Sequence, residues 1–216
     1  MEKIWIIGLG HFGLRALRQL SENNTDQCFV LADPDKKNLE KGKGPNRTLE
    51  QGDGVAFLAH HLKPGNGPDW IVPALPVHLA AEWCMLRSEQ DRFRRVTVRS
   101  GLDPLLPNSV RGPGDIYVSH ATFMCPENCS EPENICTYTK KSRKRNMFEV
   151  LKDIKFGLFE SLVIKSCQLG PGVGGYRPGQ LFELLNQVEK AKNDMLVSTA
   201  CRCHGVITGL GKTFLS

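Results

Sequence analysis

Apolar residues near the start of the chain form two short continuous runs with a helical pattern between them. Residues 4–7 make an apolar run typical of a buried strand, and Leu14, Leu17 and Leu20 follow at helical spacing. A second apolar run, at residues 28–32, comes after that pattern. The chain therefore begins with a predicted strand–helix–strand unit.

The same alternation continues to about residue 120. Strand-like apolar runs are separated by segments with helical patterns, which is typical of a parallel, doubly wound sheet. The sequence thus predicts an α/β, Rossmann-like domain over residues 1–122. The further segments behind this prediction are strands at 70–75, 95–99 and 115–119, and helices at 54–62 and 77–86.

Three glycines join the first predicted strand to the first helix, in the order Gly8, Gly10 and Gly13. The first would permit a tight turn, the second would let the backbone approach a pyrophosphate, and the third would let helix and strand pack closely. Asp33 ends the second strand about 20 residues later, where it would bind the ribose 2′-hydroxyl and repel a 2′-phosphate. The pattern predicts binding of NAD(H), or of another adenosine-containing ligand, rather than NADP(H), although the same turn also occurs without a ligand.

Three short motifs within the first 120 residues together resemble one family. These are the segment from Trp5 to Gly13, the end of the second strand from Ala32 to Asp35, and the segment from Gln51 to Gly54. They are similar to the nucleotide-binding domains that regulate potassium transport, the TrkA-N or RCK type. The resemblance implies that the three glycines hold the phosphates and that Asp33 holds the ribose. It also implies that Asp53 lies near the adenine.

Length and composition narrow the class of protein further. The 216 residues suffice for one domain of ordinary size or two small ones. No apolar stretch approaches the length of a membrane span, and the N-terminus lacks the features of a secretory signal. We therefore expect a cytoplasmic, reducing location, in which the 8 cysteines are free thiols or metal ligands. The net charge of +5 is modest and does not indicate a nucleic-acid partner.

Cysteines define the second half of the chain, and they fall into two clusters. One cluster lies in a loop rich in prolines, acids and amides, and the other follows a strand-like run. Three thiols from one segment and a ligand from a distant one can close a zinc site or hold an iron–sulfur cluster. The spacing favours neither metal, and ordinary free thiols are the alternative. The candidate ligands are Cys125, Cys129, Cys136, Cys201, Cys203 and His204.

A glycine-rich segment at 170–175 lies between a strand-like run at 161–169 and a helical pattern at 178–192. It is either a flexible connector or an anion-binding nest. A P-loop is excluded because no Gly-Lys-Ser/Thr follows. With a further predicted strand at 195–200, these segments predict a smaller, cysteine-rich α/β subdomain over residues 123–216.

Two histidines, one phenylalanine and a basic run are further candidates for function. His78 follows the predicted fourth strand, close to where a nicotinamide ring would lie, so it is either a general acid/base or a solvent-facing helix residue. His11 and Phe12 occupy the glycine turn, where they would contact the cofactor or lie on the helix surface. The basic run at 140–145 would contact phosphates or nucleic acid, or form a solvated loop or helix start.

Two function classes follow. The protein is either a regulatory protein that responds to nucleotide and metal, or an NAD-dependent oxidoreductase that uses zinc or an iron–sulfur centre. The chain has no recognisable dehydrogenase constellation, which favours the first class. A cysteine site facing the nicotinamide end of the crevice would favour the second. Either class is compatible with a small-molecule substrate, a protein partner or a homo-oligomer.

Overall fold

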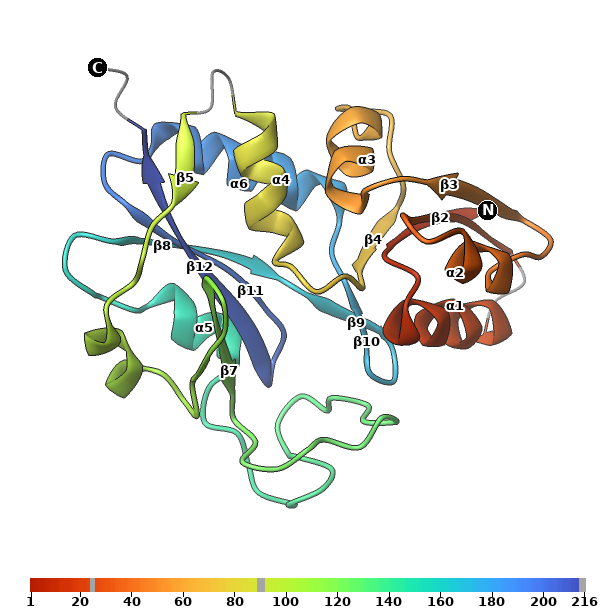
Figure 1. Ribbon diagram of the computed structural model, residues 1–216. Helices are drawn as coiled ribbons and strands as arrows, with labels where there is room; N and C mark the ends of the chain where they lie inside the picture. The colour runs from red at the N-terminus through yellow and green to blue at the C-terminus, as the bar shows by residue number, and fades with distance from the viewer. Residues whose placement is uncertain (24–25, 89–91, 214–216) are drawn as a thin grey trace.

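The computed structural model describes residues 1–23, 26–88 and 92–213, and their strands form two main sheets and a small hairpin (Figure 1). In chain order the elements are β1 (Glu2–Ile7), α1 (His11–Asn23), β2 (Gln27–Asp33), α2 (Lys36–Lys41), β3 (Arg47–Gln51), α3 (Gly54–His61), β4 (Trp70–Pro73), α4 (Leu79–Arg87), β5 (Phe93–Arg95), the 3-10 helix η2 (Ser100–Leu105), β6 (Val110–Arg111), β7 (Asp115–Ser119), α5 (Met147–Lys152), β8 (Glu160–Lys165), β9 (Cys167–Gly170), β10 (Val173–Gly175), α6 (Pro178–Lys190), β11 (Met195–Ala200) and β12 (His204–Lys212).

The first sheet is parallel throughout and has the strand order β3-β2-β1-β4. Side chains of a strand alternate between its two faces. Ile4 and Ile6 of β1 pack with α1 and α2, whereas Trp5 and Ile7 pack with α3 and α4. Helices therefore cover both faces, and the predicted α/β fold with a doubly wound parallel sheet is confirmed.

The direction in which the chain adds strands to the sheet reverses at β1. The chain moves outward from β1 to β2 and β3, then crosses back so that β4 lies on the other side of β1. In open sheets of this kind, ligands bind in the crevice outside the carboxyl ends of the strands at this point. The glycine loop after β1 and the segment 74–78 after β4 lie at this crevice.

The second sheet is larger and mixed, with the order β6-β7-β12-β11-β8 and with β5 also paired to β12. β5 and β7 pair antiparallel with β12, so residues 93–119 do not extend the parallel sheet as the sequence analysis expected. An apolar run indicates a strand but not its partner. Here the partner is β12, a strand of nine residues near the end of the chain, with which both β5 and β7 pair. Sheet pairing therefore changes after β4, near residue 78 rather than 122, and the later sheet is not the smaller of the two.

The glycine-rich segment 170–175 is the turn and second strand of a hairpin. β9 and β10 pair antiparallel around Gly172, whose φ of +68° suits a residue without a side chain. The hairpin leads to Tyr176, whose backbone N–H and C=O pair with those of Ile71 at 3.0 Å each. The expected connector or anion nest is thus an ordered link between the two sheets.

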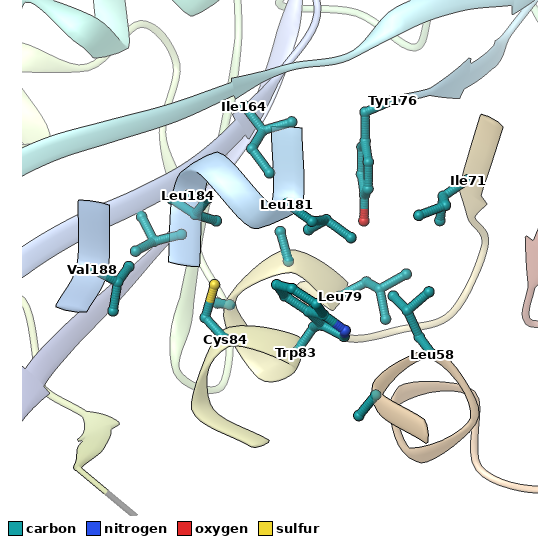
Figure 2. Close-up of a cluster of buried hydrophobic side chains, with 14 of the residues drawn as sticks. Leu58, Ile71, Leu79, Trp83, Cys84, Ile164, Tyr176, Leu181, Leu184 and Val188 are labelled. Atoms are coloured by element: carbon teal, nitrogen blue, oxygen red, sulfur yellow. The ribbon is translucent and has the colours of Figure 1, made fainter. Parts of the chain in front are cut away.

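One buried cluster joins the two parts of the molecule, namely the first sheet with its helices and the second sheet with its helices. The cluster contains side chains from α3 and β4 of the first part and from α6 and β8 of the second, with α4 between them. Figure 2 shows Trp83 and Cys84 of α4 facing Leu181 and Leu184 of α6, with the Tyr176 ring pointing into the cluster. Within the ranges that the structure describes, no helix is both long and apolar enough to cross a bilayer.

Candidate functional site

The glycine loop shows which of its glycines the fold requires. Gly8 has a φ of +93°, and a Cβ there would lie 2.6 Å from the carbonyl oxygen of Ala74. A Cβ on Gly13 would overlap the carbonyl oxygen of Gly8. At Gly10, by contrast, no described atom outside its immediate neighbours in the chain would lie within 4 Å of a Cβ. The first and third glycines therefore serve the tight turn and the helix packing, while the second faces open space.

Asp33 is buried, with 5% of its surface exposed, and its carboxylate braces the glycine loop. Oδ2 accepts a hydrogen bond of 2.5 Å from the backbone N–H of Leu9. Oδ1 accepts one of 2.8 Å from the N–H of Asp35 and one of 3.3 Å from Asn38. Since two carboxylate oxygens offer about four acceptor sites, one site remains. Asp33 therefore has a structural role, since it holds the glycine loop through these hydrogen bonds. Its spacing from the glycines in the sequence did not predict this role.

Asp35 is a second acid at the same strand end, and the sequence analysis did not single it out. Its side chain is exposed and caps α2 through a 2.8 Å hydrogen bond from the N–H of Lys37. Asp53 caps α3 in the same way, through a 2.9 Å hydrogen bond from the N–H of Ala56. Both carboxylates lie at the carboxyl ends of parallel strands. The sequence could have indicated Asp35 as a second candidate, because acids flank Pro34 on both sides.

The loop that carries the first cysteines contacts the exposed start of α1. The side chain of Glu127 lies 3.9 Å from Nε2 of His11 and 3.7 Å from NH1 of Arg15. Arg15 also donates hydrogen bonds to the carbonyl groups of Glu127 and Pro171. Arg15 was not foreseen from the sequence, although it follows the glycine motif directly. These contacts hold the cysteine loop against the helix that follows the glycine turn.

The two cysteine clusters meet at one point, where Cys125 of the loop contacts His204 of the second cluster. Sγ of Cys125 lies 3.5 Å from Nε2 of His204, and Sγ of Cys201 lies 3.8 Å from Nδ1 of the same ring. Cys129 instead contacts the Thr137 hydroxyl at 3.6 Å, and Cys203 accepts a 2.9 Å hydrogen bond from Arg143. Among the described residues, no three Cys, His, Asp or Glu side chains are arranged to hold a metal ion.

Burial sets the protonation of this cluster. It raises the pKa of the Cys201 thiol to about 12, and it lowers the pKa of His204. Burial also raises the pKa of Cys125, as does the charge that neighbouring thiolates would carry. Cys136 differs, because hydrogen bonds from Thr139 lower the pKa of its thiol. Without a bound cation, most of these sulfurs are therefore neutral thiols.

The basic run at 140–145 serves the structure of this region. Arg143 donates hydrogen bonds to the carbonyl groups of Pro132 and Glu133 as well as to Cys203. Arg145 pairs with Asp153 at 2.5 Å across the short helix α5. Of the two interpretations of this run, the structure therefore agrees with the one that placed it at a loop and helix start.

Two pockets adjoin at the crevice. A cavity of about 260 Å³ lies at the end of β4 and includes His78 in its lining. A pocket of about 650 Å³ is lined by Phe12 of α1 and by the cysteine loop. Tyr117, Thr199 and Val206 line both, so the cysteine cluster and the end of β4 open onto neighbouring space.

His78 is buried rather than facing solvent, with 4% of its surface exposed. Its Nδ1 lies 2.8 Å from the hydroxyl of Thr208, and its Nε2 lies 2.8 Å from that of Thr199. The interpretation of His78 as a solvent-facing helix residue is therefore wrong. Strands β11 and β12 cover the side chain from more than a hundred residues away in the sequence, and burial lowers its pKa to about 4.

Residues 80–213 match the model of the AF_1314_C family, described as "Uncharacterized protein, C-terminal domain". That range covers the second sheet and both cysteine clusters. The chain is also 31% identical over 223 residues to an "Uncharacterized protein" of Archaeoglobus fulgidus, and the alignment covers 95% of this chain and 97% of the relative. This similarity extends over both sheets. No solved structure matches the chain.

Proposed function

This chain belongs to the AF_1314_C family, and we propose that it is an oxidoreductase that binds NAD(H) in the crevice between β1 and β4. The observation that carries the proposal is the pair of adjoining pockets. One lies at the end of β4, and the other is lined by Phe12, Cys125 and His204. A dinucleotide in the crevice would therefore extend toward the thiols, and this position favours the oxidoreductase over the regulatory class.

The glycine loop supplies the support for a dinucleotide. Free N–H groups and the positive end of the helix dipole at the start of α1 favour a pyrophosphate. The open space at Gly10 leaves room for close approach, while Gly8 and Gly13 shape the turn. The resemblance of residues 1–120 to the TrkA-N or RCK type agrees with this assignment. When bound, the nicotinamide would supply hydride transfer.

We also propose that the cysteine cluster binds zinc or an iron–sulfur centre. Zinc bonds of about 2.3 Å to sulfur and about 2.0 Å to nitrogen, at tetrahedral angles, would place the two ligand atoms about 3.5 Å apart. Cys125 and His204 are separated by 3.5 Å, so this pair has the spacing of two ligands. The remaining ligands would come from Cys129, Cys136 or the 201–203 thiols, whose side chains would have to turn from their present hydrogen-bond partners.

Calorimetric titration of the full chain with NADH and NADPH tests the nucleotide site. We expect tighter binding of NADH, because the carboxylates of Asp33 and Asp35 would repel a 2′-phosphate. Gly10→Val should abolish binding, since its side chain would occupy the position of the pyrophosphate. The matched control is Gly179→Val, because Gly179 also has no described atom within 4 Å of a Cβ and lies on α6.

The choice of acid variant matters for this test. Asp35→Ala should reduce the preference for NADH while leaving the brace between Asp33 and the glycine loop intact. Asp33→Ala should reduce the preference and also loosen the loop. Equal affinities for the two nucleotides, or tighter binding of NADPH, would contradict the assignment.

Elemental analysis and a visible absorption spectrum of anaerobically purified protein test the metal site. We expect zinc, or iron with sulfide, and we expect a chelator to lower the melting temperature. Cys129→Ser should reduce the metal content and leave NADH binding unchanged. A protein with no metal, with all thiols titratable and with the same melting temperature after chelation would refute the metal site and leave the nucleotide site to stand.

A regulatory protein is the second candidate, and the contacts of Glu127 favour it. Because this carboxylate lies near His11 and Arg15, a bound pyrophosphate would compete with it and could release the cysteine loop. Hydrogen exchange over residues 123–143 would report such release. Faster exchange with NADH, in a protein that oxidises or reduces no substrate, would support this class over the oxidoreductase.

A further inference from the structure

A series of hydrogen bonds with a defined direction runs from the ion pair of the half-buried Arg95 and the buried Asp115 to the cavity at the end of β4. Arg95 donates a 2.8 Å hydrogen bond to Oδ1 of Asp115, so this carboxylate oxygen is a hydrogen-bond acceptor. Thr208 therefore donates its one hydroxyl hydrogen to Asp115, at 2.5 Å. Since that hydrogen is used, Nδ1 of His78 must carry a proton and donate it to Thr208, at 2.8 Å.

The direction of these bonds leaves Nε2 of His78 as an acceptor. Burial lowers the pKa of His78 to about 4, with Asp115 opposing and Arg95 adding to the effect, so the ring is neutral at pH 7. A neutral imidazole has one N–H. Thr199 Oγ1, which lies 2.8 Å from Nε2, therefore donates to it. The Thr199 oxygen keeps its lone pairs to accept a hydrogen bond from a bound molecule.

The cavity beside Thr199 has the size and chemistry of a site for a small molecule. Its volume of about 260 Å³ lies below the range of about 300–1,000 Å³ for drug-sized ligands. The walls are mostly apolar, with Leu75, Val77 and Val206 among them. The cavity also adjoins the glycine loop, because a Cβ on Gly8 would lie 3.0 Å from the backbone nitrogen of Leu75.

We propose that Thr199 is a catalytic residue that accepts the hydroxyl proton of a small, largely apolar alcohol bound in this cavity, while its own proton passes to His78. The substrate O–H bond breaks as a new O–H bond forms on Thr199. The former Thr199 O–H bond breaks as an N–H bond forms at Nε2. The products of this step are an alkoxide and an imidazolium, and the reverse path returns the proton.

The remaining residues of this hydrogen-bonded series act as positioning residues. Thr208 fixes the ring tautomer, and Asp115 stabilises the imidazolium through Thr208. Arg95, which also donates a 2.9 Å hydrogen bond to Glu82, holds the Asp115 carboxylate in place. The inference rests on the proposed function, because the alkoxide carbon would lose its hydride to oxidised nicotinamide.

The first test measures the tautomer of His78 in the full chain, with no nucleotide or substrate present. Proton–nitrogen correlation spectra of histidine-labelled protein at pH 7 should show His78 protonated at Nδ1, with the signal assigned by its loss in His78→Gln. Thr208→Val should change the tautomer, whereas Thr208→Ser should preserve it. A ring protonated at Nε2, or a charged ring at pH 7, would overturn the inference.

The second test measures reduction of NAD⁺ by propan-2-ol and butan-2-ol, alongside NADH binding by calorimetry. General acid–base catalysis contributes about 10²–10⁴-fold, so Thr199→Val should lower kcat by about 100-fold or more and leave the affinity for NADH unchanged. Thr199→Ser should restore most of the rate. Wild-type protein that binds NADH but oxidises neither alcohol, or a Thr199→Val variant as fast as wild type, would overturn the proton path. Failure to bind NADH would instead overturn the proposed function, while an Nδ1 tautomer would still support the hydrogen-bond direction.

Discussion

Acid should destabilise this protein through His78, and the size of the effect follows from its burial. The pKa is lowered from 6.5 to about 4 in the folded state, because burial disfavours the charged ring. The unfolded chain therefore binds a proton between these two values while the folded chain does not. The stability that His78 contributes is fully present above pH 6.5 and is lost as the pH falls toward 4.

The magnitude is the difference between the two pKa values multiplied by about 1.36 kcal/mol per unit. For a shift from 6.5 to about 4 this is about 3 kcal/mol. A typical domain is stable by about 5–15 kcal/mol, so a loss of this size is readily measured. Well below pH 4 the contribution should not change further, because His78 is then protonated in both states.

Urea unfolding from pH 7.5 to pH 4, at constant ionic strength, measures the effect. The free energy of unfolding of wild type should fall by about 3 kcal/mol more than that of His78→Gln. Other titrating groups, including the partly buried His120 and His204, are common to both proteins and cancel in the difference. The matched control is His60→Gln, because His60 is exposed on α3. Parallel curves for wild type and His78→Gln would refute the reasoning.

Three further predictions concern the glycine turn, the shared core and the cysteine loop. Gly13→Ala should lower the melting temperature strongly because its Cβ would overlap the carbonyl of Gly8, whereas Gly10→Ala should leave it unchanged; equal melting temperatures would contradict this distinction. Trp83→Ala should cost about 3–5 kcal/mol in urea unfolding, because the indole is fully buried between the two parts of the molecule. Glu127→Gln should tighten NADH binding in calorimetry at low salt, since it removes a negative charge beside the start of α1, and a weaker affinity would argue against that geometry.

Local patterns in the sequence sufficed for the first strand–helix–strand unit and its glycine turn. The requirement for glycine at position 8 comes from a positive φ, and the apolar run and leucine spacing report which faces are buried. These features depend on short-range sterics and on residue type, both of which can be determined from the sequence.

Strand partners and burial could not be determined in this way. The pattern of residues 115–119 is compatible with a strand in either sheet, and its actual pairing with β12 depends on residues 85 to 93 positions later in the chain. Asp33 has the spacing of a ribose ligand, but its orientation toward Leu9 appears only when the turn is folded.

His78 shows most clearly which properties can be predicted from the sequence and which require the tertiary structure. Its place after an apolar run identified it as a candidate for proton transfer from the sequence alone. Its burial, its tautomer and its contacts with Thr199 and Thr208 depend on strands that follow it by more than a hundred residues. Sequence periodicity reports which residues of a segment are apolar, whereas the hydrogen-bond partners of a buried polar group are set by long-range packing. The sequence by itself therefore determined the elements and the candidate residues, and the tertiary structure decided which of them meet.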